Sequence, residues 1–180
     1  MGEITHPTPP DGQGTCCIGI EPGETWGSDV KRDGWTDLEA FEGSCQCGTV
    51  RFRVAAGPAM HSVCHCRMCQ RATGNVFAPL VEVDNARVHI EGQIKTYRSS
   101  NVAERGFCDR CGTPLFYRTI DSDTTEFMFG AINTGIDFPP TRNHGVESRQ
   151  GWVLDLASLE DLETYFDEGK TVFSNQWEHG

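Results

Sequence analysis

The clearest alternation of apolar and polar residues lies at positions 49–54, with the sequence TVRFRV. Apolar side chains at positions 50, 52 and 54 alternate with polar ones, a period of two residues that is expected of a half-buried β-strand. Similar short segments, separated by Gly, Asn, Asp or Pro, follow at 76–83, 87–90, 94–99, 113–120 and 126–132. Strands that recur about every ten residues predict an all-β domain.

One segment near the C-terminus has helical periodicity instead. In residues 158–166, SLEDLETYF, apolar side chains recur at positions 159, 162 and 166. Ser158 and Asp161 have the spacing of a capping box at a helix start. We therefore expect one short C-terminal helix.

Residues 1–40 differ in composition from the rest of the chain. They contain seven glycines, four prolines, eight acidic and two basic side chains, with little periodicity, which disfavours regular structure. Two alternatives stay open: the segment is a solvated tail, or it lies across the domain surface through Trp26 and Trp35. In the second case it could cover the functional site as a lid or mediate dimerisation, so a homo-oligomer stays open as well.

The length of 180 residues fits a single globular domain. The formal net charge of −11 argues against binding to nucleic acids or anionic membranes, and no apolar run approaches the ~20 residues that span a bilayer. The charge is unevenly distributed, because residues 64–118 carry eight basic and five acidic side chains. This locally cationic segment favours a small anionic ligand.

The chain contains nine cysteines, and its first residues, MGEITHPTPPDGQG, lack the basic end and apolar stretch of a secretory signal. We therefore expect a cytoplasmic protein, in which thiols stay reduced and clustered cysteines more often bind metal than form disulfides. Seven of the nine form three clusters: Cys45 and Cys47 in CQC, Cys64, Cys66 and Cys69 in CHCRMC, and Cys108 and Cys111 in CDRC.

The simplest division of these seven thiols predicts two zinc ions per chain. Two pairs complete a closed tetrahedral site with a structural role: Cys45, Cys47, Cys108 and Cys111. Three ligands remain, Cys64, Cys66 and Cys69. Three protein ligands with one position left for water or a substrate thiolate are typical of a catalytic zinc site.

The identity of the fourth ligand at the second site stays open at this point. His61 or His65 could complete it, and so could Cys16 or Cys17 from the N-terminal segment. Any of these would make both metals structural and the protein a non-catalytic binding module. A redox role for the cysteines is less well supported, because three clusters exceed what one disulfide switch requires.

Three motifs, in this order and at these separations, resemble a known family: EGSCQCGTVRFRV, CHCRMCQRATG and RGFCDRCGTPLFY. A looser match continues through FMFGAINTG at 127–135 and HGVESRQGW at 144–152. The family is that of the glutathione-dependent formaldehyde-activating enzymes, which includes centromere protein V. The resemblance covers about residues 41–155, between an N-terminal extension (1–40) and a C-terminal helix and tail (156–180).

The resemblance implies a β-tent fold, in which small coiled antiparallel sheets are held together by zinc. It also implies the same division of the cysteines, with a structural zinc on four and a labile zinc on Cys64, Cys66 and Cys69. The implied activity is the reversible addition of formaldehyde to the thiol of glutathione, which is carbon–sulfur lyase chemistry in reverse.

In this hypothesis the substrate thiol takes the open position of the three-cysteine zinc, where it loses its proton. Arg71 and Arg105 are the candidates for binding the carboxylates of glutathione, because both lie next to a cysteine knuckle in the cationic segment. Two other functions remain as alternatives: a zinc-stabilised binding module without turnover, and a zinc or redox sensor that uses the labile site.

Overall fold

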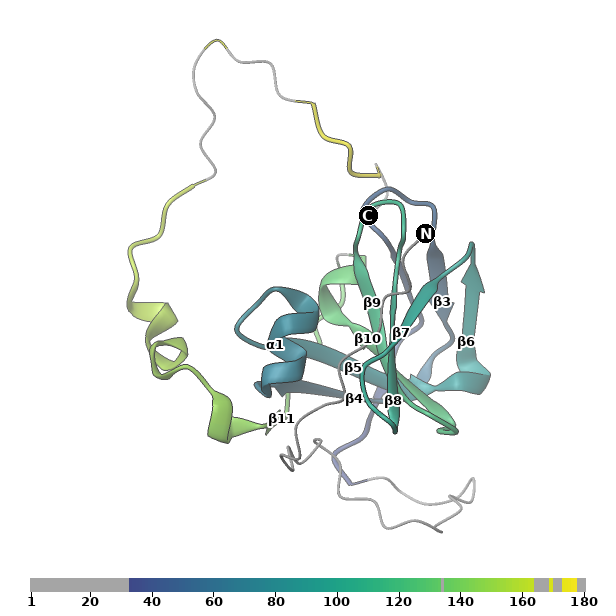
Figure 1. The fold of residues 1–180 in the computed structure, drawn as a ribbon, viewed down its shortest axis with the longest axis horizontal. Coiled ribbons are helices and arrows are strands. Elements are labelled where there is room, and N and C mark those ends of the chain that lie inside the picture. Colours follow the sequence, from purple (N-terminus) through teal and green to yellow (C-terminus); the bar gives the residue numbers. More distant parts are fainter. Residues whose placement is uncertain (1–32, 134, 164–168, 170–172, 178–180) are drawn as a thin grey trace, which may run out of the picture.

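The computed structural model describes residues 33–133, 135–163, 169 and 173–177. Within them the strands form two sheets (Figure 1). The larger sheet has the order β1-β4-β5-β10-β9-β8-β7: Thr36–Leu38, Gly57–Cys64, Ala78–Asp84, Thr124–Met128, Pro114–Thr119, Ala103–Phe107 and Lys95–Arg98. The smaller sheet has the order β2-β3-β6: Phe41–Ser44, Arg51–Val54 and Val88–Glu91. The all-β class with antiparallel sheets is confirmed.

One strand departs from the antiparallel pattern. β11 (Arg142–His144) pairs in parallel with the second half of β4, while β1 pairs antiparallel with the first half of the same edge. The remaining elements are short: α1 (Arg67–Thr73) and the 3-10 helices η1 (Asn85–Arg87), η2 (Phe129–Ala131), η3 (Val146–Ser148) and η4 (Gly151–Ser158). β1 lies in the region 1–40, so the described part of that segment joins the large sheet. Trp26 lies outside the described residues.

The core fills the space between the two sheets. Phe52 of the small sheet stacks on Phe127 of the large sheet, with ring centroids 4.2 Å apart, and Phe116 contacts Phe127 edge-on. The alternating pattern of β3 buries Phe52 and Val54, as the sequence predicted. Burial of large aromatic side chains is the main stabilising contribution in such a core.

All six strands expected from the sequence are present, with ends shifted by a few residues. Five strands were not predicted: β1, β2 and β11, which have only three or four residues each, and the longer strands β4 and β8, whose sequences do not alternate. β4 carries His61 and Ser62 among its buried residues, and β8 buries Arg105. A sequence pattern treats these polar side chains as exposed, so it does not detect a strand that buries them.

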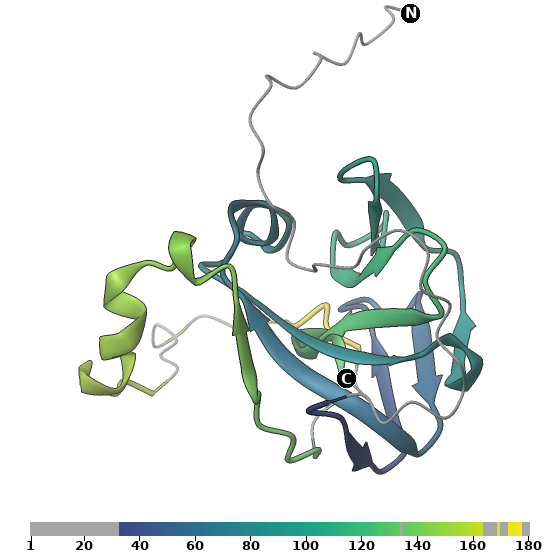
Figure 2. The same ribbon diagram turned by 90° about the horizontal axis from the view of Figure 1, so that it is seen from below.

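The helix predicted over 158–166 is wrong in the part that the structure describes. The 3-10 helix η4 ends at Ser158, residues 159–163 have no regular structure, and residues 164–166 lie outside the described residues. Leu159 and Leu162 are 63% and 83% exposed, so no packing stabilises an amphipathic helix there. η4 stands apart from both sheets in the two views (Figure 1 and Figure 2). None of the helices in the described ranges has the length and apolarity to cross a bilayer.

Candidate metal centres

The first cluster joins two chain turns that are far apart in sequence. Cys45 follows β2, and Cys108 follows β8; both are fully buried. The four sulfurs of Cys45, Cys47, Cys108 and Cys111 all lie within 4.8 Å of one another. The Sγ atoms of Cys45 and Cys47 are 3.6 Å apart, and those of Cys47 and Cys108 are 3.9 Å apart.

These distances fit a zinc ion. A tetrahedral site with Zn–S bonds of about 2.3 Å places its sulfurs about 3.8 Å apart. Gly112, with φ of 78°, donates its N–H to the carbonyl of Cys108 and closes the turn that presents Cys108 and Cys111 together. The spacing-based prediction that these four cysteines converge is therefore met by the geometry, and their donor set is the one that structural zinc prefers.

The thiols of this cluster have very different acidities in the absence of a metal. Burial raises the pKa of the Cys45 thiol to about 12. Burial also acts to raise the pKa of Cys111, but hydrogen bonds with Thr113 outweigh it and lower that pKa to about 6. A metal that binds all four as thiolates must therefore displace a proton from Cys45, so metal binding here releases protons near neutral pH.

The second cluster lies where β4 meets α1. Cys64 is the last residue of β4, Cys66 is the N-cap of α1, and Cys69 lies within the helix. Their sulfurs are within 4.8 Å of one another, and all three residues are buried. The neighbouring thiols of Cys64 and Cys66, and then burial, hold the pKa of Cys69 well above its ordinary value.

The sequence did not predict α1, although this helix makes the second cluster. Its seven residues, RMCQRAT, are too short and too polar for periodicity to be read. The Sγ atom of Cys66 accepts a hydrogen bond from the backbone N–H of Cys69 at 3.4 Å, so one cluster residue caps the helix that carries another. The sequence therefore has no recognisable helix start here, because cysteine is not a usual N-cap residue.

The two histidines considered as a fourth ligand lie outside the second cluster. His61 is hydrogen-bonded through Nδ1 to the carbonyl of Phe138, and its ring stacks on Phe129. It lies three positions before Cys64 in β4, so the two side chains point to opposite faces of the sheet. His65 is buried, and its Nε2 pairs with Oδ1 of Asn143 at 3.0 Å.

Among the described residues, no histidine or carboxylate joins the three sulfurs of Cys64, Cys66 and Cys69. The alternative in which His61 or His65 completes this site is therefore not supported by the geometry. Cys16 and Cys17, the other candidates, lie outside the described residues. The described part of the chain thus supplies three sulfur ligands, which is the donor number of a zinc site with an exchangeable position.

A separate segment braces the second cluster. β11 lies parallel to β4 with His144 opposite Cys64, and the N–H of His65 donates to the carbonyl of His144 at 2.8 Å. Gln70 of α1 donates through Nε2 to the carbonyls of both His65 and Ser148, at 2.6 and 3.0 Å. His144 and Ser148, the two ends of the HGVES segment, therefore anchor the loop that carries the second cluster. The looser motif match at 144–152 was the only sequence signal for them.

Gly145 is a required glycine of this brace. Its φ of 62° lies in the left-handed region, and a Cβ placed on it would lie 2.7 Å from the backbone nitrogen of Cys66. The brace therefore approaches the cluster loop backbone to backbone, which only a residue without a side chain permits.

The two arginines proposed from the sequence are placed very differently. Arg71 is exposed in the last turn of α1. Arg105 of β8 is only 7% exposed, and its NH2 group donates to Sγ of Cys69 at 3.3 Å. Its guanidinium lies over the ring of Tyr117, 4.9 Å from the centroid. Arg105 therefore contacts the second cluster, whereas Arg71 lies exposed on α1.

Register places Arg105 in a row of side chains that crosses the large sheet, between Tyr97 of β7 and the partners on its other side. Directly opposed residues of an antiparallel pair point to the same face of the sheet. The successive partners from β8 to β4 are Arg105, Tyr117, Glu126, Glu82 and Met60. Burial, and secondarily the charge of Glu82, raises the pKa of Glu126 to about 8 despite the opposing effect of Arg105. This face therefore carries a carboxyl group that is mostly protonated at neutral pH.

Replacing Glu126 with glutamine should flatten the dependence of stability on pH. Because the folded-state pKa of about 8 exceeds the ordinary 4.5, the folded protein binds a proton that the unfolded chain has released between these values. Wild-type stability should therefore be full below about pH 4.5 and fall as pH rises through 8. At about 1.4 kcal/mol per pKa unit, Glu126→Gln should gain roughly 2–4 kcal/mol over wild type at alkaline pH.

Urea unfolding of both proteins at pH 5, 7 and 9 measures this difference. Glu39→Gln, at an exposed position just before β2, is the matched control and should follow the wild-type profile. Parallel profiles for wild type and Glu126→Gln would contradict the prediction.

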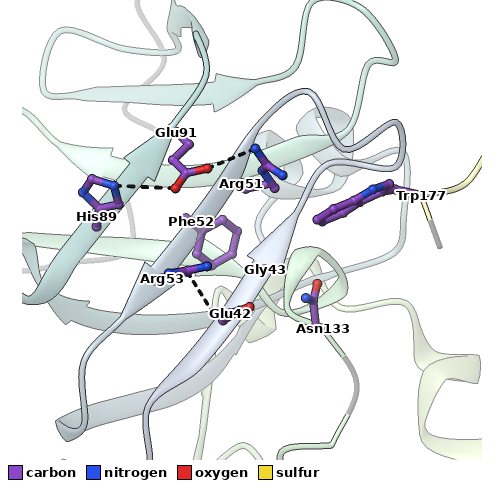
Figure 3. A pocket seen from close by; sticks show the side chains of 9 residues that line it. All are labelled: Glu42, Gly43, Arg51, Phe52, Arg53, His89, Glu91, Asn133 and Trp177. Atoms are coloured by element: carbon purple, nitrogen blue, oxygen red, sulfur yellow. Dashed lines mark ion pairs between the residues drawn. The ribbon is translucent and has the colours of Figure 1, made fainter. Parts of the chain in front are cut away.

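A small pocket of about 70 Å³ lies over the smaller sheet, and none of the residues that line it is a cysteine (Figure 3). Its charged side chains are paired, Arg51 with Glu91 at 3.1 Å and Arg53 with Glu42 at 2.9 Å. Trp177 lies beside Arg51, whose guanidinium is 5.2 Å from the ring. With its charges already paired, this pocket offers no group for the chemistry that the cysteines suggest.

Comparison with known proteins places this architecture in a family. The family model described as glutathione-dependent formaldehyde-activating enzyme matches residues 40–147. A Halomonas elongata protein named "Putative glutathione-dependent formaldehyde-activating enzyme" is 32% identical over 126 residues, which cover 63% of this chain and 79% of the relative.

Two further proteins are similar to this chain. An uncharacterised lyase of Schizosaccharomyces pombe is 27% identical over 100 residues, covering 56% of this chain and 73% of that protein. A crystal structure of a Rhodobacter sphaeroides protein is 17% identical with a TM-score of 0.45, covering 57% of this chain and 98% of that one. The family match spans more than half of the residues and includes both cysteine clusters. The chain therefore belongs to the family of glutathione-dependent formaldehyde-activating enzymes.

Proposed function

We propose that the protein is a zinc-dependent carbon–sulfur lyase or synthase that acts on a thiol–aldehyde adduct such as S-hydroxymethylglutathione. In the synthetic direction the thiol sulfur adds to the carbonyl carbon of formaldehyde, a C–S bond forms, and the thiol proton passes to the carbonyl oxygen. The reverse reaction breaks the same bond and returns the proton to sulfur. No oxidant or reductant is needed. Family membership and the names of the relatives support this chemistry.

The observation that carries the proposal is the second cluster. Three buried sulfurs, those of Cys64, Cys66 and Cys69, converge, and no described histidine or carboxylate joins them. A zinc ion held by these three sulfurs would supply a Lewis acid that lowers the pKa of an added thiol toward neutral pH. Thiol activation suits this site better than water activation, because three thiolate donors weaken the Lewis acidity of the metal.

The residues around the cluster then have defined tasks. β4 and α1 hold the three sulfurs together, and β11 with Gln70 keeps their loop in place. Arg71, exposed on α1, is the candidate for binding a carboxylate of the incoming glutathione. The four-cysteine cluster would hold a structural zinc ion, since its four sulfurs leave no position for substrate.

The seven described cysteines are all free of disulfides. Free thiols at metal-ligand spacing suit a reducing compartment, and we therefore propose that the protein acts in the cytoplasm.

Exchange spectroscopy by NMR tests the activity directly. Mixtures of glutathione and formaldehyde at equilibrium with their adduct are measured with and without the full-length, zinc-replete protein. The proposal expects an exchange rate that rises in proportion to protein and saturates with glutathione. It expects the rate to fall to the uncatalysed value when a mild chelator removes the labile metal, and the increase to return when zinc is added. S-methylglutathione, which has no thiol, is the control for non-specific peptide effects and should not exchange.

An exchange rate that is the same with and without the protein would contradict the enzyme. Glutathione that binds in calorimetry without accelerating exchange would identify a binding module with the same fold.

A further inference from the structure

A cluster of three thiolates around a divalent metal ion has a formal charge of −1. Addition of a substrate thiolate would bring the charge to −2. The sulfurs lie in the protein interior, where Cys64, Cys66 and Cys69 are all less than 10% exposed. Buried charge is strongly unfavourable unless an opposite charge or hydrogen-bond donors lie beside it. The cluster as a metal site therefore requires a positive charge or hydrogen-bond donors beside it.

Arg105 is in the position to supply both. Its NH2 group donates to Sγ of Cys69, and the residue is only 7% exposed. Tyr117, its partner in the neighbouring strand β9, lies beneath the guanidinium plane and fixes its direction. Cys69 is 36 residues away in the sequence, so the contact comes only from the fold.

Within the described part of the chain, no carboxylate forms an ion pair with Arg105. Its Nε and NH1 atoms have no hydrogen-bond partner among the described residues, although both are buried. The next carboxyl group in its row, Glu126, is mostly protonated at neutral pH because its pKa is about 8. By contrast, Arg118 on the same strand as Tyr117 pairs with Glu104. A buried guanidinium without a carboxylate partner is available to compensate a different anion.

We infer that Arg105 is a positioning residue that compensates the negative charge of the Cys64, Cys66 and Cys69 cluster and so makes it selective for a thiolate as the added ligand. The inference rests on the proposed function only in taking this cluster as a metal site; it requires no turnover. It also assigns Arg105 a task different from binding a glutathione carboxylate, because its contact is with the cluster sulfur itself.

Cobalt substitution of the full-length protein provides the test, because cobalt–thiolate absorption reports metal at the sulfurs. Competition with a chelator should show a tight site and a weaker site. In Arg105→Gln the weaker affinity should fall by about 10–100-fold, the usual effect of losing a hydrogen-bond partner of a metal ligand. The tight, four-cysteine site should be unchanged and thereby shows that the fold is intact. Arg105→Lys, which keeps the charge, should recover most of the affinity.

Added ligands then separate charge compensation from substrate recognition. 2-Mercaptoethanol carries no carboxylate, and imidazole is neutral. Arg105→Gln should weaken the binding of mercaptoethanol to the cobalt-loaded cluster at least about 10-fold more than that of imidazole. Arg98→Gln, which removes the same charge from an exposed site on β7, is the matched control and should change neither.

Three results would overturn the inference. The first is unchanged cobalt affinity at the weaker site of Arg105→Gln. The second is an equal loss for mercaptoethanol and imidazole. The third is a loss that appears with glutathione but not with mercaptoethanol, which would return Arg105 to carboxylate binding. If Arg105→Gln does not fold, the thiolate preference of Arg105→Lys decides, because the charge model requires that it be retained.

Discussion

Cys108→Ser is expected to abolish cooperative folding. Cys108 is fully buried, and its sulfur lies 3.9 Å from that of Cys47, across 60 intervening residues. The four-cysteine cluster thereby joins the end of β2 in the small sheet to the end of β8 in the large sheet. Structural zinc contributes an apparent binding free energy of roughly 10–16 kcal/mol, which exceeds the ~5–15 kcal/mol by which a typical domain is stable.

Near-UV circular dichroism and thermal unfolding of the purified variants measure this effect. Cys69→Ser removes one buried sulfur from the other cluster and is the matched control, which should keep a cooperative transition. Strong chelators should have the same effect on wild type as the Cys108→Ser substitution. A Cys108→Ser protein with the melting temperature of wild type would show that the four-cysteine cluster does not hold a structural metal.

Cys66→Ser should remove thiol exchange while leaving the protein folded. The substitution takes one of three sulfurs from the second cluster, and its effect on metal affinity should exceed the roughly 10–100-fold cost of losing an outer partner. Serine is a preferred N-cap residue, so the hydroxyl can still accept the hydrogen bond from the N–H of Cys69 that starts α1. The loss should therefore come from the ligand and not from the helix.

Two measurements check this expectation. Isothermal titration should detect glutathione binding to zinc-replete wild type and none to Cys66→Ser, and exchange spectroscopy should show the uncatalysed rate for the variant. Met68→Leu, a change of similar volume in the same helix that keeps all three sulfurs, should behave as wild type. Glutathione binding of equal strength in wild type and Cys66→Ser would remove the metal–thiol hypothesis.

The strand content of this protein was predictable because most strands have one buried face. Val54 and Phe52 alternate with arginines, and a period of two is then visible in one dimension. Alternation of apolar and polar residues failed to predict the strands that bury polar side chains. β4 buries His61 and Ser62, and β8 buries Arg105, because partners from other strands and loops satisfy or use these groups.

The predicted C-terminal helix failed for the opposite reason. Leu159 and Leu162 have helical spacing, but they are exposed, and an isolated amphipathic segment of this length gains too little from its own hydrogen bonds to form. α1 forms with a weaker sequence signal, because Cys66 caps it and Gln70 ties it to η3 and the cluster loop. Tertiary contact decided both outcomes.

The sequence by itself determined which neighbouring cysteines can share a metal ion. Spacings of one or two residues force neighbouring sulfurs onto one centre, because the chain between them is too short to separate them. Only the tertiary structure decided which other groups surround those centres. The register of β4 turns His61 away from Cys64, and the pairing of β8 with β9 sets Arg105 over Tyr117 and against Cys69. Such contacts depend on strand register between distant segments, and no local pattern of residues specifies that register.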